Sequence, residues 1–187
     1  TAPVGTYPIT ATVSGAAAGN YNPTVTPGNL TITQAPLTLT INNATRAYGA
    51  ANPVFTGTFT GLVNGDTITP TYSTTATVTS PVGSYPISAT LSGAALANYN
   101  PTIVPGTLTV TQATLTVTIN NATRAYGAAN PVLTGTITGL VNGDTITPTY
   151  STTATVTSPV GSYPISATLS GAALANYNPT IVPGTLT

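Results

Sequence analysis

Only four side chains of this 187-residue chain carry a full charge at neutral pH, and they form two matching sets. Arg46 and Asp66 return, with the same spacing, as Arg124 and Asp144. General acid–base catalysis needs a carboxylate, histidine, lysine or cysteine held in a cleft. The chain has no histidine for a catalytic triad, and neither set contains a carboxylate pair for glycoside hydrolysis. The sequence therefore predicts no catalytic residues and no enzyme.

The same shortage of ligands argues against bound metals and cofactors. Zinc sites use cysteine and histidine, and the chain contains neither. Calcium requires several carboxylates or a dense set of carbonyl oxygens, whereas each set here offers one aspartate. The absence of cysteine also removes disulfides and is compatible with any redox compartment. We therefore expect no metal site and no cofactor.

The arginines and aspartates allow a binding interpretation and a structural one. Arg46 could bind an anion such as an acidic glycan, or its guanidinium could tie loop carbonyl groups together or reach an aspartate. With one arginine and one aspartate in each set, we expect an ion pair within or between repeats, formed among Arg46, Asp66, Arg124 and Asp144. An exposed pair of this kind contributes at most about 1 kcal/mol. Asp66 follows Asn64 and Gly65, so a turn residue that bonds nearby backbone amides is a further expectation.

Tyrosines and asparagines are the remaining candidates for recognition. Tyrosines could stack on sugars, although such residues more often fill a sandwich core or a corner with the hydroxyl bonded to backbone. Asn29, Asn43 and Asn121 each begin an Asn-X-Thr tripeptide. Because a nearly chargeless surface needs another source of solubility, we treat these three asparagines as candidate N-glycosylation sites.

An internal repeat of 78 residues sets the positions of all these groups. Residues 37–109 and 115–187 differ at three positions, all of them exchanges between apolar residues. Residues 1–35 align with the second half of the same unit in a more diverged form. We therefore predict three segments: 1–35 as a C-terminal half-repeat, 36–113 as a complete repeat, and 114–187 as a repeat lacking the end of its last strand.

Within a repeat, the sequence pattern is typical of β-strands. Threonine, a β-branched residue that suits strands, accounts for 44 of the 187 residues, and apolar and polar positions alternate over short runs. About seven strands separated by turn signals predict an immunoglobulin-like β-sandwich. The expected strands are residues 37–41, 54–62, 67–73, 74–80, 83–93, 99–104 and 107–111. The last two are expected to form a closing hairpin around Pro105 and Gly106, and residues 93–98 to form at most one helical turn.

The connections between repeats are very short. Two or three residues, in the sequences QAP and QAT, separate the last strand of one unit from the first strand of the next. A connection of this length between β-branched neighbours is stiff. We expect all-β domains arranged end to end as a rod, with Arg46 and Arg124 stiffening the junction or its loop.

Several motifs, in a fixed order, resemble a known family. The segments AYGAANPV, GLVNGD, PVGSYPI and NYNPTIVPGTLTVTQA are similar to the MBG-type (YGX) immunoglobulin-like repeats of large bacterial surface proteins. The resemblance covers the whole chain, counting the partial first copy. It implies β-sandwich domains in long tandem arrays of adhesins and other giant secreted proteins, located outside the cell.

Charge composition also limits the partners. Two arginines cannot form a basic patch for nucleic acid, and no apolar run approaches the ~20 residues that span a bilayer. Zero net charge and threonine-covered sheets without edge lysines favour lateral or end-to-end self-association, and glycans are a further candidate partner. The half-repeat 1–35 is expected to belong to a longer array or to receive strands from another chain.

Two functions remain after these exclusions. The first is a structural array that forms a stiff extracellular stalk or filament on a bacterial cell surface. The alternative is an adhesin module that binds glycans or the surface of a host or neighbouring cell. Near-identity between the copies favours the structural interpretation, because the units look interchangeable.

Overall fold

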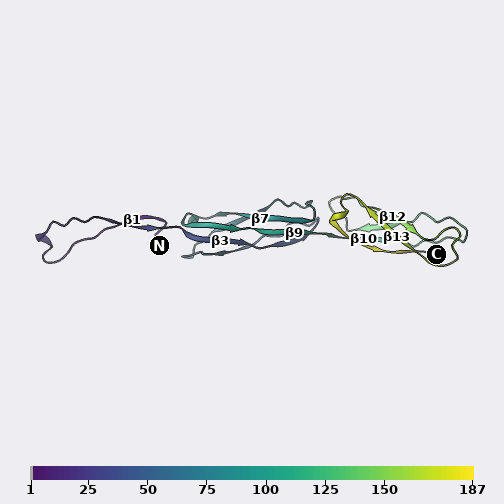
Figure 1. Cartoon of the computed structure of the whole chain (residues 1–187), viewed down its shortest axis with the longest axis horizontal. Coiled ribbons are helices and arrows are strands. Elements are labelled where there is room, and N and C mark those ends of the chain that lie inside the picture. Colours follow the sequence, from purple (N-terminus) through teal and green to yellow (C-terminus); the bar gives the residue numbers. More distant parts are fainter. Residues whose placement is uncertain (1) are drawn as a thin grey trace. The chain divides into compact units, whose positions relative to one another are not determined.

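A computed structural model describes residues 2–187, and its regular structure consists of β-strands with three short 3-10 turns (Figure 1). The all-β prediction is therefore confirmed. The partial repeat contains β1 (Gly5–Ile9), η1 (Ala18–Asn20) and β2 (Gly28–Ile32). The complete repeat contains β3 (Ala35–Ile41), β4 (Ala44–Ala47), β5 (Gly57–Thr60), β6 (Thr69–Thr74), β7 (Gly83–Ser92), η2 (Ala94–Asn98), β8 (Tyr99–Val104) and β9 (Gly106–Thr111). The third segment contains β10 (Ala113–Ile119), β11 (Gly135–Thr138), β12 (Thr147–Thr152), β13 (Tyr163–Ser170), η3 (Leu174–Asn176), β14 (Tyr177–Val182) and β15 (Gly184–Leu186).

Two compact units make up the chain, and the boundary between them does not follow the repeats. One unit comprises residues up to Asn42 together with 55–73 and 87–106, and the other comprises 43–54, 74–86 and 107–187. The division passes through the complete repeat. As a result, each of the two junctions between repeats lies inside a single unit.

The third segment forms two small sheets with an apolar core between them. In the third segment the sheets have the strand orders β11-β10-β14 and β12-β13-β15. Ile119 of the first sheet packs with Ile165 and Leu186 of the second. The alternation of threonine with apolar residues explains this arrangement, because successive side chains of a strand point to opposite faces. In β10, for example, Leu115 and Val117 are buried and the threonines between and beside them are less so.

The complete repeat contains seven strands, in the orders β5-β3-β8 and β4-β9-β7-β6. This is the predicted number, but one expected strand is wrong and one was missed. Residues 75–80 form a loop closed by a turn, in which the Ser80 amide donates to the Thr77 carbonyl over 3.0 Å. The missed strand is β4, which follows the asparagine pair Asn42 and Asn43 directly.

The predicted closing hairpin around Pro105 and Gly106 is also wrong. β8 pairs in parallel with β3, and β9 pairs in parallel with β4, both with the same offset in register. The chain therefore passes from one sheet to the other at Pro105 without reversing. Gly106 permits the crossing, because a Cβ there would lie 2.7 Å from the Asn42 carbonyl oxygen.

Two local predictions are confirmed in the complete repeat. Asn64 and Gly65 have φ angles of 57° and 71°, and the Asp66 amide donates to the Val63 carbonyl over 3.0 Å. Positive φ at both central residues is typical of the tight turn that the Asn-Gly pair indicates. The segment 93–98 contains one short 3-10 turn, η2.

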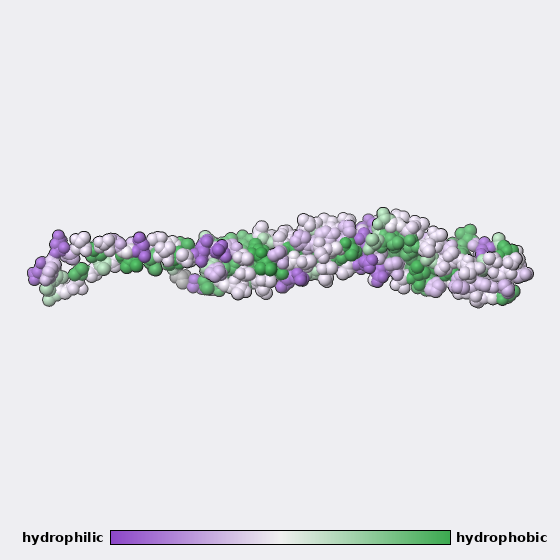
Figure 2. Space-filling view, in the orientation of Figure 1, coloured by the Kyte–Doolittle hydropathy of each residue, from purple (hydrophilic) through white to green (hydrophobic). Residues whose placement is uncertain are grey.

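Strongly hydrophilic areas are sparse on the face shown in Figure 2, as the low charge content predicts.

The described part of the partial repeat contains two strands, β1 and β2. β1 and β2 pair in the register that β13 and β15 also use, with Tyr7 opposite Leu30. The counterpart of β8 does not form, because the strand that pairs with β8 in the complete repeat has no equivalent in residues 2–34. The predicted segment 1–35 begins at Thr1, which lies outside the described residues.

Candidate functional site at the repeat junction

The complete repeat continues into the next one through a single residue. β9 ends at Thr111 and β10 begins at Ala113, so only Gln112 interrupts two consecutive strands. The Gln112 side-chain amide donates to the Ala175 carbonyl over 3.1 Å. The connection is thus as short as the sequence suggested, and its one residue is itself bonded to the following repeat.

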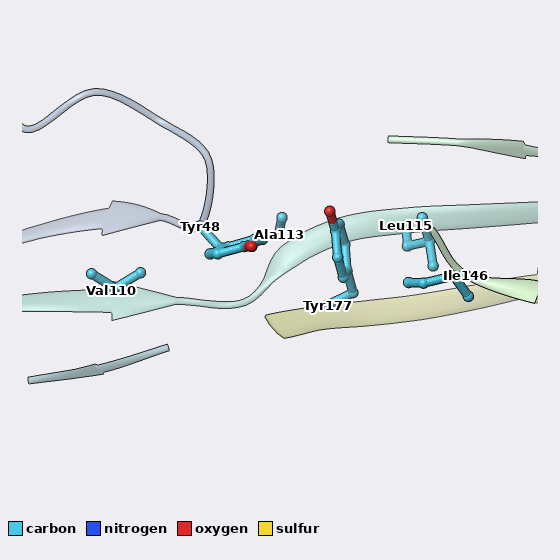
Figure 3. Packing of buried hydrophobic residues seen from close by; sticks show 6 residues of the cluster. All are labelled: Tyr48, Val110, Ala113, Leu115, Ile146 and Tyr177. Carbon is cyan, nitrogen blue, oxygen red and sulfur yellow. The ribbon is translucent and has the colours of Figure 1, made fainter. Parts of the chain in front are cut away.

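Tyr48 lies immediately after β4 and contacts the following repeat. Its amide donates to the Thr111 carbonyl over 2.8 Å, and its ring meets the Tyr177 ring edge to face, with centroids 5.6 Å apart and planes at 82°. Edge-to-face pairs add about 0.5–1.5 kcal/mol beyond the burial of the rings. In Figure 3, Ala113 lies between Tyr48 and Tyr177. The buried members of this cluster are Tyr48, Val110, Ala113, Leu115, Ile146 and Tyr177.

Gly49 brings the backbone of this loop against the next repeat. Its φ is +79°, a region that side-chain-bearing residues rarely adopt. A Cβ at this position would lie 2.4 Å from a methyl carbon of Val141. Both the backbone conformation and the close approach therefore require glycine here.

Two further hydrogen bonds cross the same junction. The Val82 amide donates to the Asn176 side-chain oxygen over 3.0 Å, and the Asn142 side-chain amide lies 3.4 Å from the Val78 carbonyl. Both asparagines belong to the third segment, and both valines belong to the loops of the complete repeat. The junction therefore combines an aromatic centre with a polar rim.

Arg46 supports the loop that carries Tyr48. It is 7% exposed and is the only buried charged residue among residues 2–187. Its Nε donates to the Asn52 side-chain oxygen over 2.7 Å, and its two terminal nitrogens donate to the carbonyls of Ala47 and Thr77. Asn52 in turn donates to the Ala76 carbonyl over 2.7 Å. The loop 75–80 has carbonyls available for these bonds because it does not form the strand predicted there.

The aspartates have tyrosine partners. Tyr99 donates to Asp66 over 2.8 Å and accepts from the Val63 amide over 3.0 Å, and Tyr177 contacts Asp144 and Val141 at the same distances. Within residues 2–187 no hydrogen bond joins an arginine to an aspartate. The structure therefore places the members of the expected ion pair in separate networks. The Asp66 carboxylate also bonds a side-chain hydroxyl, whereas backbone amides were the expected donors.

These contacts shift the pKa of both tyrosines upward. For Tyr99, the hydrogen bond from Val63 lowers the pKa, but burial and the adjacent Asp66 carboxylate raise it by more. For Tyr177, burial raises the pKa, the Val141 bond opposes the shift, and Asp144 adds to it. Each phenol thus stays protonated to higher pH than a free tyrosine and continues to donate to its aspartate.

The candidate glycosylation sites lie on exposed positions. Asn43 and Asn121 accept hydrogen bonds from the amides of Thr107 and Thr185, both over 2.8 Å, through their side-chain oxygens. These bonds stabilise the point where the paired strands change sheets. Asn29 lies in the exposed strand β2. Glycosylation of all three residues stays a prediction.

The described residues offer structural contacts rather than reactive groups at this site. No cluster of three or more His, Cys, Asp or Glu residues that could hold a metal ion exists in the part of the chain from residue 2 onward. None of the helical segments in that part has the length and apolar character to cross a bilayer. What the arrangement can do is to fix one repeat against the next.

Sequence reasoning missed the residues that carry the junction. From the sequence, the tyrosines are expected in a core or a corner and Gly49 is not singled out, because the contacts of these residues cross between repeats. A signal was present in the sequence, since the Tyr-Gly pair lies in AYGAANPV, one of the motifs that carry the family resemblance. The scarcity of charge singled out Arg46, whereas the residue that reaches the next repeat, Tyr48, is two positions further on.

Comparisons with known proteins agree with the motifs. The family described as MBG domain (YGX type) matches residues 37–109 and 115–187. No match was found among curated proteins or among solved structures. The matched family is a repeat domain, and no catalytic family matched. The segment boundaries predicted from the repeat, 1–35, 36–113 and 114–187, stay predictions.

Proposed function

Since this chain belongs to the MBG domain (YGX type) family, typical of repeats in bacterial surface proteins, we propose that it is a structural array. In this proposal the tandem domains form a stiff stalk or filament outside the cell. Each domain acts as a spacer, and its Tyr-Gly loop limits bending relative to the domain that follows. The observation that carries the proposal is the junction itself, where one residue separates two strands and Tyr48 packs on Tyr177.

The scarcity of other chemistry supports the same proposal. Tyr85 and Tyr163, expected as candidates for sugar stacking, donate to the carbonyls of Pro81 and Pro159 over 2.9 and 2.8 Å. These bonds hold each tyrosine against its own loop. No observation on the described residues favours a glycan site over a structural role, so the adhesin alternative gains no support of its own.

Bending at the junction can be measured directly in solution. Val54 and Val132 are 91% and 88% exposed, occupy equivalent positions and lie on opposite sides of the junction. Because the chain has no cysteine, Val54→Cys and Val132→Cys allow specific spin labelling. We expect a narrow label-to-label distance distribution that broadens when Tyr48 is replaced by alanine.

The control is the same substitution at Tyr126, which should leave the distribution unchanged. A wild-type distribution as broad as that of Tyr48→Ala would contradict the proposed stiffness. Electron microscopy of native material tests the larger claim. Filaments or surface rods with a repeat near the domain length are expected, and isolated flexible chains would argue against a stalk.

A further inference from the structure

The first two and last two strands of the complete repeat run in the same direction. β8 pairs in parallel with β3, from Ala35 opposite Tyr99 onward. β9 pairs in parallel with β4, up to Ala47 opposite Thr111. Because both pairs have the same offset in register, the stretch 35–47 is joined to the stretch 99–111 by two consecutive parallel ladders.

Hydrogen bonds continue where the chain passes from one ladder to the next. At this crossing the Thr107 amide donates to the Asn43 side-chain oxygen over 2.8 Å. Beyond β4, the Tyr48 amide donates to the Thr111 carbonyl over 2.8 Å. A side chain thus supplies the acceptor at the point where the strands are interrupted, and the backbone bonds resume after it.

The third segment has the same arrangement. β14 pairs in parallel with β10. The amides of Ala122 and Arg124 donate to the carbonyls of Thr185 and Thr187 over 2.9 and 2.8 Å. The Thr187 amide donates back to the Ala122 carbonyl over 3.0 Å. The parallel ladders are therefore a property of the repeat and not of one copy.

These ladders determine how the complete repeat responds to tension. The chain enters the repeat at the start of β3 and leaves it at the end of β9. Because these points are opposite ends of the ladders, tension along the chain pulls β3 and β4 one way and β8 and β9 the other. The hydrogen bonds of a parallel ladder are evenly spaced across the strands. They therefore share the load, and they must break together before the strands separate.

An antiparallel pair pulled at its open end responds differently. β6 and β7 are neighbours in their sheet, and their counterparts β12 and β13 are antiparallel. The Ser92 hydroxyl, at the end of β7, donates to the Thr69 carbonyl, at the start of β6, over 3.3 Å. Tension between these two residues loads one residue pair at a time. Neither residue lies where the chain enters or leaves the repeat.

We propose that the repeats of this chain bear tension, and that their parallel ladders carry the load. The function is that of a tether, in which each repeat keeps its fold while force passes along the chain. Tension and bending are separate properties, because the ladders lie within a repeat and the contact of Tyr48 with Tyr177 lies between repeats. The proposal therefore goes beyond the stiff array and does not depend on it.

Single-molecule force spectroscopy on the full chain tests this proposal by changing only where force is applied. Because the chain has no cysteine, two introduced cysteines at exposed positions define the attachment points. Thr33→Cys with Thr114→Cys loads the complete repeat along its ladders. Thr69→Cys with Ser92→Cys pulls at the open end of β6 and β7.

The two geometries should give different unfolding rates. At the same force, we expect unfolding along the ladders to be slower by about tenfold or more, because several hydrogen bonds must break in one step. Thermal unfolding without force shows that both cysteine variants are folded to the same extent. Unfolding along the ladders that is as fast as unfolding from the open end, or faster, overturns the proposal.

Two neighbouring asparagines provide matched variants. Asn43 accepts at the crossing between the ladders, whereas the Asn42 side chain donates to the Thr56 hydroxyl over 2.9 Å, outside the ladders. With force applied along the ladders, Asn43→Ala should speed unfolding by a larger factor than Asn42→Ala. With force applied at the open end of β6 and β7, the two variants should unfold at similar rates. Equal acceleration by both variants along the ladders would show that the crossing carries no load and would overturn the proposed path.

Discussion

The Tyr48–Gly49 loop and the Tyr126–Gly127 loop have the same sequence and different surroundings. Tyr48 is 6% exposed and packs on Tyr177, whereas Tyr126 is 69% exposed. A Cβ on Gly49 would clash with Val141, but a Cβ on Gly127 would meet nothing within 4 Å. The two glycines nevertheless share a positive φ, +79° and +83°. The loop conformation is therefore intrinsic to the repeat, while burial of the tyrosine depends on the repeat that follows.

The arginine networks differ in a related way. Arg46 donates from Nε to Asn52, whereas Arg124 donates from Nη1 to the Ala128 carbonyl over 3.1 Å. Both arginines still bond the equivalent carbonyl of the neighbouring loop, at Thr77 and Thr155. The arginine thus bonds the Thr77 or Thr155 carbonyl whether or not the tyrosine of its loop is buried. Among the described residues, the bond to an asparagine side chain is found only at Arg46, where Tyr48 is buried. Substitution at paired positions isolates what the following repeat contributes.

The largest difference is expected between Tyr48→Ala and Tyr126→Ala. Truncation of a buried aromatic side chain costs about 3–5 kcal/mol, whereas exposed positions usually change stability by less than about 0.5 kcal/mol. Urea unfolding of the two variants should show this difference. Equal destabilisation would mean that contacts within the loop, rather than contact with Tyr177, determine the effect.

Gly49→Ala against Gly127→Ala is expected to give the next largest difference. Both changes place a side chain at positive φ, which costs about 1–2 kcal/mol. Only at Gly49 does the new methyl group meet Val141, and overpacking adds about 1–3 kcal/mol. Thermal unfolding of both variants measures the excess. A Gly127→Ala variant as unstable as Gly49→Ala would show that backbone strain alone is responsible.

Asn52→Ala against Asn130→Ala tests the arginine network. Each asparagine donates to a loop carbonyl over 2.7 Å, at Ala76 or Ala154, but only Asn52 also accepts from an arginine. Loss of a hydrogen bond to a charged group costs about 1.5–3 kcal/mol, so Asn52→Ala should be the less stable variant by about that amount. Hydrogen exchange of the Tyr48 amide provides a local measurement of the same effect. If the Tyr48 amide exchanged at the same rate in both variants, Asn52 would have no part in supporting the loop.

Local patterns explain why much of the fold was predictable. Alternation of threonine with Leu37, Leu39 and Ile41 fixes a strand with one buried face, and the Asn64–Gly65 pair fixes a turn with two positive φ angles. Both features depend on neighbouring residues in the sequence. The family motifs reflect the same regularities, and the family assignment from them is confirmed.

Long-range contacts explain the errors. The segment 74–80 alternates like a strand, yet its carbonyls bond Arg46 and Asn52 across the loop. Pro105 and Gly106 look like a hairpin turn, yet parallel pairing of β8 and β9 with earlier strands carries the chain onward. At the candidate site, the contact of Tyr48 with Tyr177 spans two repeats, and no local pattern in the sequence encodes that pairing. The charge of Arg46 directed attention to the right loop, and only the structure identified the contact.

The smallest effect concerns pH and the phenol of Tyr177. Burial and Asp144 raise the pKa of Tyr177 above the usual value of 10.0, so the unfolded chain loses this proton first as pH rises. Stability contributed by the group is complete below pH 10 and is lost as pH rises through the folded pKa. We expect Tyr177→Phe to flatten the decline of unfolding free energy above about pH 10, when its pH profile is compared with that of the unchanged chain. An unaltered alkaline decline in Tyr177→Phe would show that the bond to Asp144 does not couple this phenol to folding.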